Sequence, residues 1–304
     1  MMRLAVLCSP ESWYFKDLCR AADGRYDLAP LPFRRLQSGL DNAGVSVSSG
    51  NEDLGAYDAV LVRTMPPGSL EQVVFRMDAL AALQAEGTCV VNPPKALEAA
   101  VDKYLATLLL RRAGLDVPRT IAAQGANEAM VAFSELGGDV VIKPLFGGEG
   151  RGITRLADEA LAERAFKMLE QLGGLIYLQE FVPHAGYDLR LFVVGNRVLG
   201  MRRSNDRDWR TNVSRGATTE ALVVEDRLAE IARRAARAIG APLAGVDLLP
   251  TLDGRLLALE VNAVPGWKAL SKTLRIDVAA LVLECLRDQV VQQSMSNKLC
   301  VANP

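Results

Sequence analysis

The sequence predicts a protein of mixed α/β and α+β class. Strand-like and helix-like segments alternate over the first 90 residues, which is the pattern of a small open parallel sheet. Beyond residue 114, apolar strand-like runs follow one another through short links, as they do in hairpins. The length of 304 residues is enough for about two domains with a large buried core.

The first part of the chain has the clearest element signals. Three segments are predicted strands: 4–8, 56–63 and 88–92. The segment 69–86 is a predicted helix, with Ser69 as N-cap, apolar residues at helical spacing and Gly87 after its last turn. Pro93 and Pro94 follow the third strand and mark a domain boundary.

The later elements alternate less regularly. A helix is predicted at 98–113 and ends at Gly114. Further strands are predicted at 139–146, 150–156, 175–182, 187–195 and 197–203, and further helices at 158–172 and 225–239. Gly195 and Asn196 join two of these strands in a predicted hairpin. The polar segment from residue 291 is expected to be a flexible tail.

The composition indicates an ordinary globular protein. Half of the residues are hydrophobic, 23% are charged and the formal net charge is −1. Without a basic excess, the composition gives no support for a nucleic-acid partner. The apolar runs are too short to span a membrane, and the N-terminal segment "MMRLAVLC" is typical of a first strand rather than of a signal peptide.

The cysteines and the single histidine narrow the chemistry further. The five cysteines show no C-x-x-C spacing and are odd in number, so we expect reduced thiols, a cytoplasmic protein and no zinc site. His184 is the one histidine, which leaves a serine or cysteine triad with a single candidate base. Its position beside Pro183 is typical of a loop residue.

The stretch "VVIKPLFGGEGRGIT", residues 140–154, is rich in glycine between two apolar runs. Backbone N–H groups of such loops often hold phosphates. The stretch does not match the P-loop, which needs a lysine after its last glycine, or the dinucleotide pattern, which needs glycine in place of Ile153. Its lysine, Lys143, comes before the glycines, and points either to a specific site or to the surface. The glycines permit a mobile hairpin flap that closes over an anion.

The segment "GVDLLPTLDGRLLALEVNA", residues 245–263, is a second predicted hairpin. Asp253 and Gly254 form a strong two-residue turn signal between apolar strands. With these two as the loop, Asp247 lies directly opposite Glu260. The hairpin therefore brings two carboxylates together on one sheet face.

Two facing carboxylates repel each other, so a neighbouring cation is needed to offset the repulsion. Asn262 projects from the same face as Glu260, and a set of oxygen donors suits magnesium or manganese rather than zinc. Two alternatives stay open. Both charges can face water, or the register can differ, because Pro250 cannot donate to the sheet ladder.

Basic side chains complete the candidate site. Lys103 stands at the start of a predicted helix turn, where a functional and a surface position are equally compatible with the sequence. The segment "MRRSNDRDWRTNVSRG" holds five arginines, at positions 202, 203, 207, 210 and 215. Guanidinium groups bind phosphate and carboxylate oxygens, and we expect two of the five to contact a substrate. A solvated loop or a nucleic-acid arm would have the same composition.

Taken in order, these motifs resemble those of the ATP-grasp carboxylate–amine ligases, above all the RimK-like branch. The motifs are Lys103, "VIKPLFGGEGRGI", "LQEFV", "YDLRLFVVG", "RTNVSRG" and "GVDLL…LEVN". The resemblance implies an ATP-grasp fold, in which two α+β lobes clamp ATP, preceded by a small Rossmann-like α/β domain. The implied division is an N-terminal domain at 1–92, a small lobe with the flap at 93–178, a large lobe with the metal site at 179–290 and the flexible tail at 291–304.

The resemblance also implies a role for each candidate residue. The ATP phosphates would be held by Lys103 and Lys143, beneath the flap glycines Gly147, Gly148, Gly150 and Gly152. Adenine would be read by Gln179, Glu180, Phe181 and Val182, and the ribose hydroxyls by Asp188. Two Mg²⁺ or Mn²⁺ ions would be bound by Asp247, Glu260 and Asn262. The γ-phosphate, the acyl phosphate and the amino acid would face Arg190, Arg203, Asn212 and Arg215.

The implied activity is the ADP-forming ligation of an acid to an amino acid, with L-glutamate as the expected amine. ATP would phosphorylate a carboxylate to an acyl phosphate, which the amine then attacks to form an amide. After "EVN" the sequence has "AVPGWKAL". Trp267 and the helix from Ser69 to Leu80 are more similar to members that glutamylate tetrahydromethanopterin-type cofactors than to those that modify a ribosomal protein. The acceptor would be such a cofactor or a peptide carboxylate.

Three other functions remain compatible with the sequence. One is a ligase of the same fold with another amino acid or acceptor, such as a ribosomal-protein C-terminus. A second is a non-catalytic ATP-binding regulatory module, against which the complete set of Asp247, Glu260 and Asn262 argues. A third is a kinase that stops at phosphorylation. The acceptor, the number of residues added, the choice between Mg²⁺ and Mn²⁺ and the presence of a homo-oligomer do not follow from the sequence.

Overall fold

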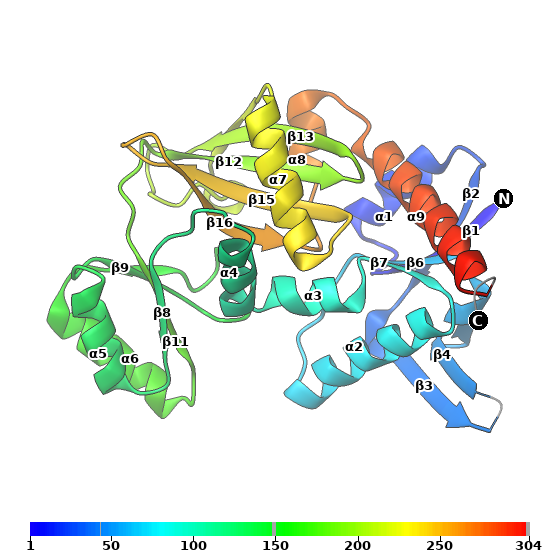
Figure 1. The fold of residues 1–304 in the computed structure, drawn as a ribbon, viewed down its shortest axis with the longest axis horizontal. Coiled ribbons are helices and arrows are strands. Elements are labelled where there is room, and N and C mark those ends of the chain that lie inside the picture. The colour runs from blue at the N-terminus through cyan, green and yellow to red at the C-terminus, as the bar shows by residue number, and fades with distance from the viewer. Residues whose placement is uncertain (43, 148–149, 302–304) are drawn as a thin grey trace.

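The computed structural model describes residues 1–42, 44–147 and 150–301, and it begins with a parallel sheet of order β2-β1-β6-β7 (Figure 1). Its strands are β1 (Met2–Leu7), β2 (Tyr26–Leu31), β6 (Ala59–Val62) and β7 (Cys89–Val91). The helices that connect them are α1 (Trp13–Ala22) and α2 (Leu70–Ala85). We call this sheet the N-terminal sheet. It confirms the predicted open parallel sheet.

Helix α2 begins as the sequence predicts. The Ser69 hydroxyl accepts a hydrogen bond from the N–H of Gln72 at 3.3 Å, and the Gln72 side chain accepts one from the N–H of Ser69 at 3.3 Å. This capping box satisfies donors at the helix start. A small antiparallel sheet that the sequence did not reveal lies before α2, formed by β3 (Leu36–Asp41), β4 (Gly44–Ser49) and β5 (Glu52–Asp53).

The second part of the fold is an antiparallel sheet of order β10-β9-β11-β8, here called the small sheet. Its strands are β8 (Thr120–Ala123), β9 (Val140–Lys143), β10 (Thr154–Leu156) and β11 (Ile176–Glu180). Helices α5 (Ala126–Glu135) and α6 (Glu159–Gln171) cover one face. Phe133 and Phe166 are central to its own hydrophobic core. β9 and β10 pair across the glycine stretch, which confirms the predicted hairpin.

The third part is an antiparallel sheet of order β14-β13-β12-β15-β16, here called the large sheet. Its strands are β12 (Tyr187–Val194), β13 (Arg197–Ser204), β14 (Thr218–Ala221), β15 (Leu243–Pro250) and β16 (Leu256–Asn262). The helices around it are α3 (Pro94–Val101), α4 (Lys103–Arg112), α7 (Asp226–Ile239), α8 (Lys268–Leu274) and α9 (Val278–Val301).

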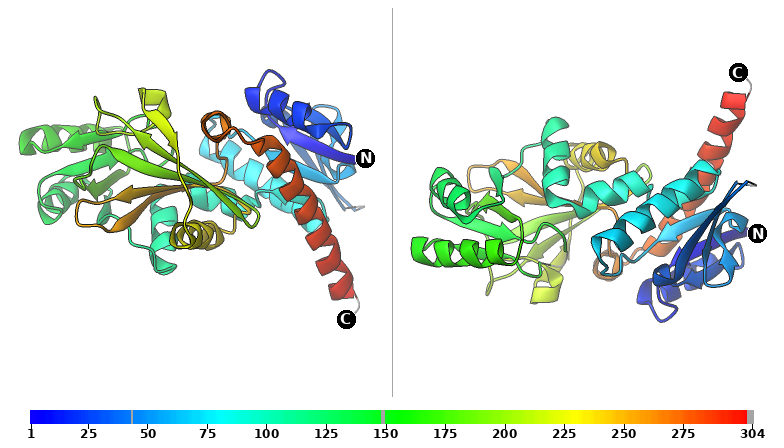
Figure 2. Two further views of the ribbon diagram at one scale, coloured as in Figure 1. Left: turned by 90° about the horizontal axis from the view of Figure 1, so that it is seen from above. Right: turned by 90° about the horizontal axis from the view of Figure 1, so that it is seen from below.

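The large sheet and the N-terminal sheet share their cores. Strand side chains alternate between faces, and in β12 Leu191 belongs to one shared core while Phe192 belongs to the other. α3, α4 and α7 contribute to the first core, and α1, α8 and α9 to the second. The small sheet lies at the opposite end of the molecule from the N-terminal sheet (Figure 2).

Two helix predictions need correction. The predicted helix 98–113 is two helices, because Asp102 has extended backbone angles and its carboxylate caps α4 by accepting the N–H of Leu105 at 3.0 Å. α9 continues to Val301 through most of the segment predicted to be a flexible tail. This segment contains no glycine or proline before residue 304, so nothing interrupts the helix earlier.

The hairpin β15–β16 has the predicted pairing at the end that carries Asp247 and Glu260, but its turn differs from the predicted one. Asp247 pairs with Glu260, as expected. Nearer the turn, Leu248 pairs with Ala258 and Pro250 with Leu256, so the loop is one residue longer than the predicted Asp253-Gly254 turn. A β-bulge that leaves Leu259 as the extra residue restores the register.

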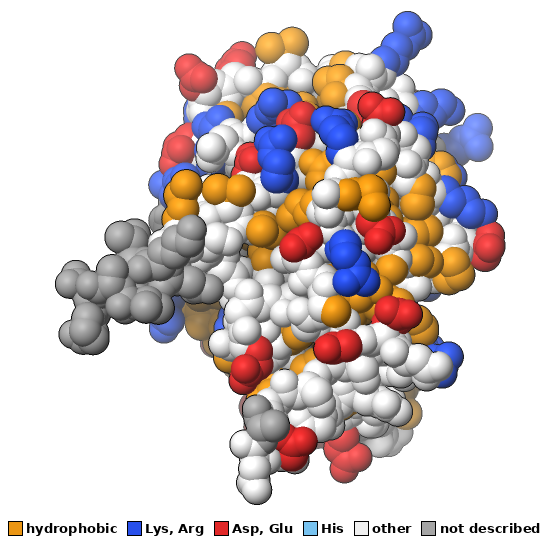
Figure 3. All heavy atoms as spheres, turned by 90° about the vertical axis from the view of Figure 1, so that its right-hand side faces the viewer, with side chains coloured by type: hydrophobic (Ala, Val, Ile, Leu, Met, Phe, Trp, Pro, Cys, Tyr) orange, Lys and Arg blue, Asp and Glu red, His pale blue; other side chains and the backbone are white. Residues whose placement is uncertain are grey.

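The surface and the helices have the mixed polarity that the composition indicates for a globular protein. Figure 3 shows the face of the N-terminal sheet and α9 that lies away from the small sheet, where basic and acidic side chains are interspersed with apolar ones. Within the described part of the chain, no helix is both long enough and apolar enough to cross a membrane.

Candidate functional site

A cavity of about 100 Å³ lies between the small and large sheets. Many predicted site residues line it: Lys143, Gln179, Glu180, Phe181, Val182, Asp188, Arg203, Asn212, Asp247 and Glu260. The others described lie outside this lining: Lys103, Gly147, Gly150, Gly152, Arg190, Arg215 and Asn262. Gly148 lies outside the described residues. Residues far apart in the sequence thus meet in one cavity.

Two lysines approach the cavity from different elements. Lys143 ends β9 and donates a hydrogen bond to the side-chain oxygen of Gln179 on the neighbouring strand β11. The Gln179 amide in turn donates to Thr120 Oγ1 at 3.0 Å. Lys103 begins α4 and donates to the carbonyl oxygen of Gly147 at 2.7 Å. Lys103 therefore contacts the glycine stretch directly, and Lys143 lies at the end of the strand that leads into it.

The lysines are poorly solvated. Burial lowers the pKa of Lys143 from 10.5 to about 8, although Glu260 and Asp247 act in the opposite direction. Burial also lowers the pKa of Lys103. Because little water screens them, these ammonium groups attract an anion more strongly than a surface lysine does.

The pKa of Lys143 gives a testable pH dependence. As the pH rises through about 8, this ammonium loses its proton, so the affinity of the protein for ADP is expected to fall. The unfolded chain keeps the proton to higher pH, so the contribution of Lys143 to the free energy of unfolding rises over the same range.

Titration calorimetry of ADP binding at several pH values checks this pH dependence. Lys143→Met should bind ADP weakly and without this dependence; a wild-type affinity that stays constant from about pH 7 to 9.5 contradicts the assignment.

The facing carboxylates have cationic neighbours that sequence reasoning did not place. Asp247 makes ion pairs with Arg190 at 2.9 Å and with Arg203 at 3.0 Å. Arg203 also donates two hydrogen bonds to Asp188, at 2.7 and 2.5 Å. Glu260 stands opposite Asp247. Two guanidinium groups therefore offset the charge of Asp247 before any metal is considered.

This network is buried, and its charges depend on one another. Burial acts against the charge of Asp247, but Arg190, Arg203 and Lys143 outweigh it and hold the pKa of Asp247 below its usual range. Asp188, expected to accept ribose hydroxyls, has both oxygens bound to Arg203 in the structure. It thus orients Arg203 and, through it, Asp247.

The oxygen atoms near Glu260 fit a hard divalent cation. Oδ1 of Asp247 is buried and forms the 2.9 Å ion pair with Arg190 Nε, but it accepts no hydrogen bond. Oδ1 of Asn262 accepts the N–H of Val264 at 2.7 Å, which fixes the amide orientation and leaves a second lone pair. In the described part of the chain, no three His, Cys, Asp or Glu side chains are placed so that they could hold a metal ion together, so the Asn262 amide is needed to complete an oxygen-only set.

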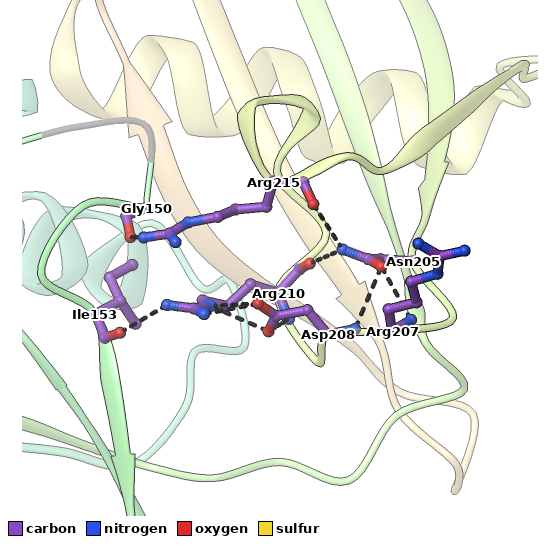
Figure 4. A network of polar contacts seen from close by, with 7 residues as sticks. All are labelled: Gly150, Ile153, Asn205, Arg207, Asp208, Arg210 and Arg215. Atoms are coloured by element: carbon purple, nitrogen blue, oxygen red, sulfur yellow. Dashed lines mark hydrogen bonds and ion pairs between the residues drawn. The ribbon is translucent and has the colours of Figure 1, made fainter.

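The glycine flap contacts the arginine-rich loop (Figure 4). Arg215 donates to the carbonyl oxygen of Gly150 at 3.5 Å, and Arg210 donates to that of Ile153 at 3.2 Å. Asn205 fixes the loop by donating to the carbonyl oxygen of Arg210 at 2.9 Å. The flap therefore closes against the loop that carries Asn212 and Arg215.

Gly150 is required at this contact for two reasons. Its φ is +71°, which L side chains rarely adopt, and an added Cβ would lie 2.5 Å from Asn212 Oδ1. Gly150→Val is expected to lower kcat/KM for ATP by about 10-fold or more, because the flap cannot close. Gly173→Val is the matched control, since Gly173 has φ +66° and open space around its Cβ position. Equal kinetic losses in both variants contradict a role for the flap.

The cavity also has an apolar side that sequence reasoning missed. Val141, Leu249 and Leu259 line it. Val141 stands two residues before Lys143 on β9, so the two-residue period of a strand could have identified it. Leu259 comes from the bulge, for which the sequence carries no comparable signal.

An aromatic group closes one end of the cavity. The rings of Phe181 and Trp209 meet edge to face, with centroids 5.7 Å apart. His184 lies beside Phe181, and its Nδ1 accepts the N–H of Gly186 at 3.2 Å. Burial lowers the pKa of His184, so the imidazole is neutral at pH 7 and orders its own loop.

Comparison with known proteins decides the family. A family model described as the RimK-like ATP-grasp domain matches residues 100–286. The chain belongs to the RimK-like ATP-grasp family. It is an ATP-dependent ligase of the alpha-L-glutamate ligase family, as its relatives show. The resemblance and the fold inferred from the sequence are thereby confirmed.

Two relatives illustrate this membership. The tetrahydromethanopterin:alpha-L-glutamate ligase of Methanosarcina acetivorans is 33% identical, over 93% of this chain and 97% of that protein. A probable alpha-L-glutamate ligase of Haemophilus influenzae is 32% identical, over 75% of this chain and 76% of that protein.

Solved structures agree on the fold. The RimK domain protein of Sphaerobacter thermophilus has a TM-score of 0.71 and 25% identity, covering 93% of this chain and 98% of that one. The ATP-grasp ligase PsnB, complexed with a minimal precursor, Mg and ADP, has a TM-score of 0.73 and 21% identity, covering 95% of this chain and 97% of that one.

Proposed function

We propose that this ATP-grasp ligase joins L-glutamate to a substrate carboxylate through an acyl phosphate and releases ADP. The observation that carries the proposal is one cavity that combines the desolvated Lys143, the facing carboxylates Asp247 and Glu260, and Arg203. The relatives named for glutamate ligation support L-glutamate as the amine. A tetrahydromethanopterin-type cofactor is the first candidate acceptor because of the Methanosarcina acetivorans relative, and a peptide carboxylate is the second.

The apolar side of the cavity is where we place adenine. Val141 and Leu259 offer apolar contacts for the faces of the base. The carboxylate of Glu180 accepts the N–H of Arg119 at 2.9 Å, and the N–H of Phe181 donates to the carbonyl oxygen of Asp139 at 2.9 Å. Because the Phe181 N–H and Glu180 Oε1 are engaged, we assign hydrogen bonding with adenine to the backbone of Val182 and to the second carboxylate oxygen of Glu180.

The polar side is where we place the phosphates. Lys143 and Lys103 would bind them, with the flap glycines closing above. Magnesium held by Asp247, Glu260 and Asn262 would supply neutralisation of the phosphate charge. A substrate carboxylate oxygen would attack the γ-phosphorus as the bond to ADP breaks. Arg203 and Arg190, oriented by Asp247, would hold the acyl phosphate while the amine attacks its carbonyl carbon and phosphate leaves.

The structure removes one sequence argument for the acceptor. Trp267 is completely buried and packs against Tyr14 and Phe192. Its place in the core accounts for a large apolar side chain at this position, so its presence does not distinguish a pterin acceptor from a peptide. Support for the cofactor acceptor now comes from the relatives and from the helix at Ser69–Leu80.

We retain the proposed division into an N-terminal domain, two lobes and a C-terminal segment, with one change. The predicted lobe boundary between residues 178 and 179 falls inside β11, whose residues Gln179 and Glu180 pair with β9. We therefore place this boundary after Glu180. We also propose a cytoplasmic location, which the free thiols of Cys8, Cys19, Cys89 and Cys285 support.

The proposal is tested by incubating the protein with ATP, magnesium, L-glutamate and candidate acceptors, followed by mass spectrometry. We expect glutamyl units on a tetrahydromethanopterin-type cofactor or on a peptide C-terminus, together with ADP. ADP release that needs the acceptor but gives no amide with any amino acid would support the kinase alternative. Binding of ATP without turnover under all conditions would support the regulatory module.

A further inference from the structure

Arg63 is a buried cation outside the ATP site. It follows β6 directly, and its side chain is 5% exposed. Its Nη2 donates to the carbonyl oxygen of Pro265 at 2.9 Å, but Nε and Nη1 have no hydrogen-bond partner. The guanidinium carbon lies 4.8 Å from the ring centroid of Tyr14 and 4.4 Å from that of Trp267. Two aromatic rings thus hold the group while two of its nitrogens remain unpaired.

Among the described residues that influence the pKa of Arg63, no carboxylate compensates its charge. Burial lowers the pKa of Arg63 to about 10, opposed only by Tyr14 and Cys8. The nearby Asp17 is already engaged, since it accepts the Trp267 indole N–H at 2.9 Å and pairs with Arg20 at 2.8 Å. A buried charge without an ionic partner is unfavourable, and a bound anion would relieve it.

The position of Arg63 in the sheet is one where ligands bind in α/β folds. In the order β2-β1-β6-β7, the chain leaves β1 toward β2 on one side, whereas β6 lies on the other. The carboxyl ends of β1 and β6 therefore form a topological switch point. Arg63 and the first turn of α1 both stand there, and the N-cap Ser12 makes no side-chain hydrogen bond to the N–H groups of that turn. These N–H groups favour an anion.

The same place adjoins the ligase cavity. Pro265, which binds Arg63, lies three residues after Asn262. A Cβ on Gly245 would lie 2.5 Å from Arg190 Nη1 and 3.1 Å from Pro265 Cβ, so Arg190 and Pro265 meet over this glycine. Arg190 in turn pairs with Asp247. A continuous series of contacts therefore links Asp247 to Arg63 through Arg190 and Pro265.

We propose that Arg63 and the first turn of α1 form a carboxylate-binding subsite for a substrate of the ligase. The identity of the ligand rests on the proposed function, but the ligand can bind to the subsite without turnover. Tyr14, Thr64 and Met65 are only partly buried, so a ligand enters from the side of these residues. The carboxylate belongs either to the acceptor or to the incoming amino acid.

Equilibrium binding tests the subsite without catalysis. N-acetyl-L-glutamate stands for an acyl acceptor, since its amine is blocked, and L-glutamate stands for the amine donor. Titration calorimetry of the whole protein with each probe, and separately with Mg-ADP, is compared between the wild type and Arg63→Met. We expect Arg63→Met to weaken one of the two probes by about 10-fold or more while Mg-ADP binding stays within about 2-fold. The probe affected identifies the source of the carboxylate.

Arg76→Met is the matched control. Arg76 is also 5% exposed, donates to a proline carbonyl oxygen, that of Pro66 at 2.7 Å, and lies over the ring of Phe33. The Arg76→Met variant should bind both probes as the wild type does.

If Arg63→Met does not fold, Arg63→Lys keeps the charge with fewer donors and should still weaken the binding of the affected probe. Unchanged affinity in a folded Arg63 variant, or no binding of either probe to the wild type, overturns the subsite. Loss of turnover with Arg63-dependent binding intact would count against the ligase reaction instead.

Discussion

Replacing Glu260 by alanine is expected to lower the rate of ADP release by roughly 10³-fold or more, because the phosphates lose a metal ligand and charge neutralisation in the transition state. Glu260 lines the cavity opposite Asp247 and raises the pKa of Lys143. Its removal therefore also leaves Lys143 with less of its counter-charge.

The fold should survive this change. Glu260 is only partly buried, and Asp247 keeps Arg190 and Arg203 as partners. Circular dichroism and thermal unfolding of Glu260→Ala should match the wild type closely. Glu220→Ala, at an exposed position of β14 on the same sheet, is the control and should retain full activity. Near-normal ADP release by Glu260→Ala would remove this residue from the metal site.

Arg203→Met is expected to destabilise the protein by about 3–5 kcal/mol, because it leaves two buried carboxylates without their common partner. Arg203 and Asp188 are each 3% exposed, and Asp247 is 6% exposed. Chemical denaturation measures the free energy of unfolding. Adding Asp188→Asn should recover part of the loss, since one uncompensated charge is then removed.

An arginine pair nearer to solvent provides the comparison. Arg210 binds Asp208 at 2.6 Å, with about a fifth of each side chain exposed (22% and 23%). Because water screens this pair, Arg210→Met should cost less than about 1 kcal/mol. Equal costs for Arg203→Met and Arg210→Met would contradict the view that the Arg203 network is a desolvated one.

The sequence was informative where residues close together in the chain determine the local structure. Asp253 and Gly254 located the β15–β16 hairpin, and the pairing of Asp247 with Glu260 followed from strand geometry. That pairing is correct although the loop is longer than expected, because the bulge at Leu259 shifts the register back. The capping box at Ser69 likewise determined the start of α2.

The sequence was uninformative where contacts between distant elements decide. Nothing local shows that Arg190 and Arg203 neutralise Asp247 across strands, or that Asp188 is bound by Arg203. The break at Asp102 was missed because the helical spacing of apolar residues continues through it. The burial of Trp267 was missed for a similar reason, since its partners Tyr14 and Phe192 come from other parts of the chain.

The central claim is that the substrate carboxylate is activated as an acyl phosphate. The most direct test uses the acceptor identified by mass spectrometry, labelled with ¹⁸O in both carboxylate oxygens and turned over with ATP, magnesium and L-glutamate. Transfer to the γ-phosphorus moves one labelled oxygen, so the released phosphate should carry one ¹⁸O per amide formed while the amide keeps the other. Amide formation with no ¹⁸O in the phosphate would contradict the acyl-phosphate mechanism.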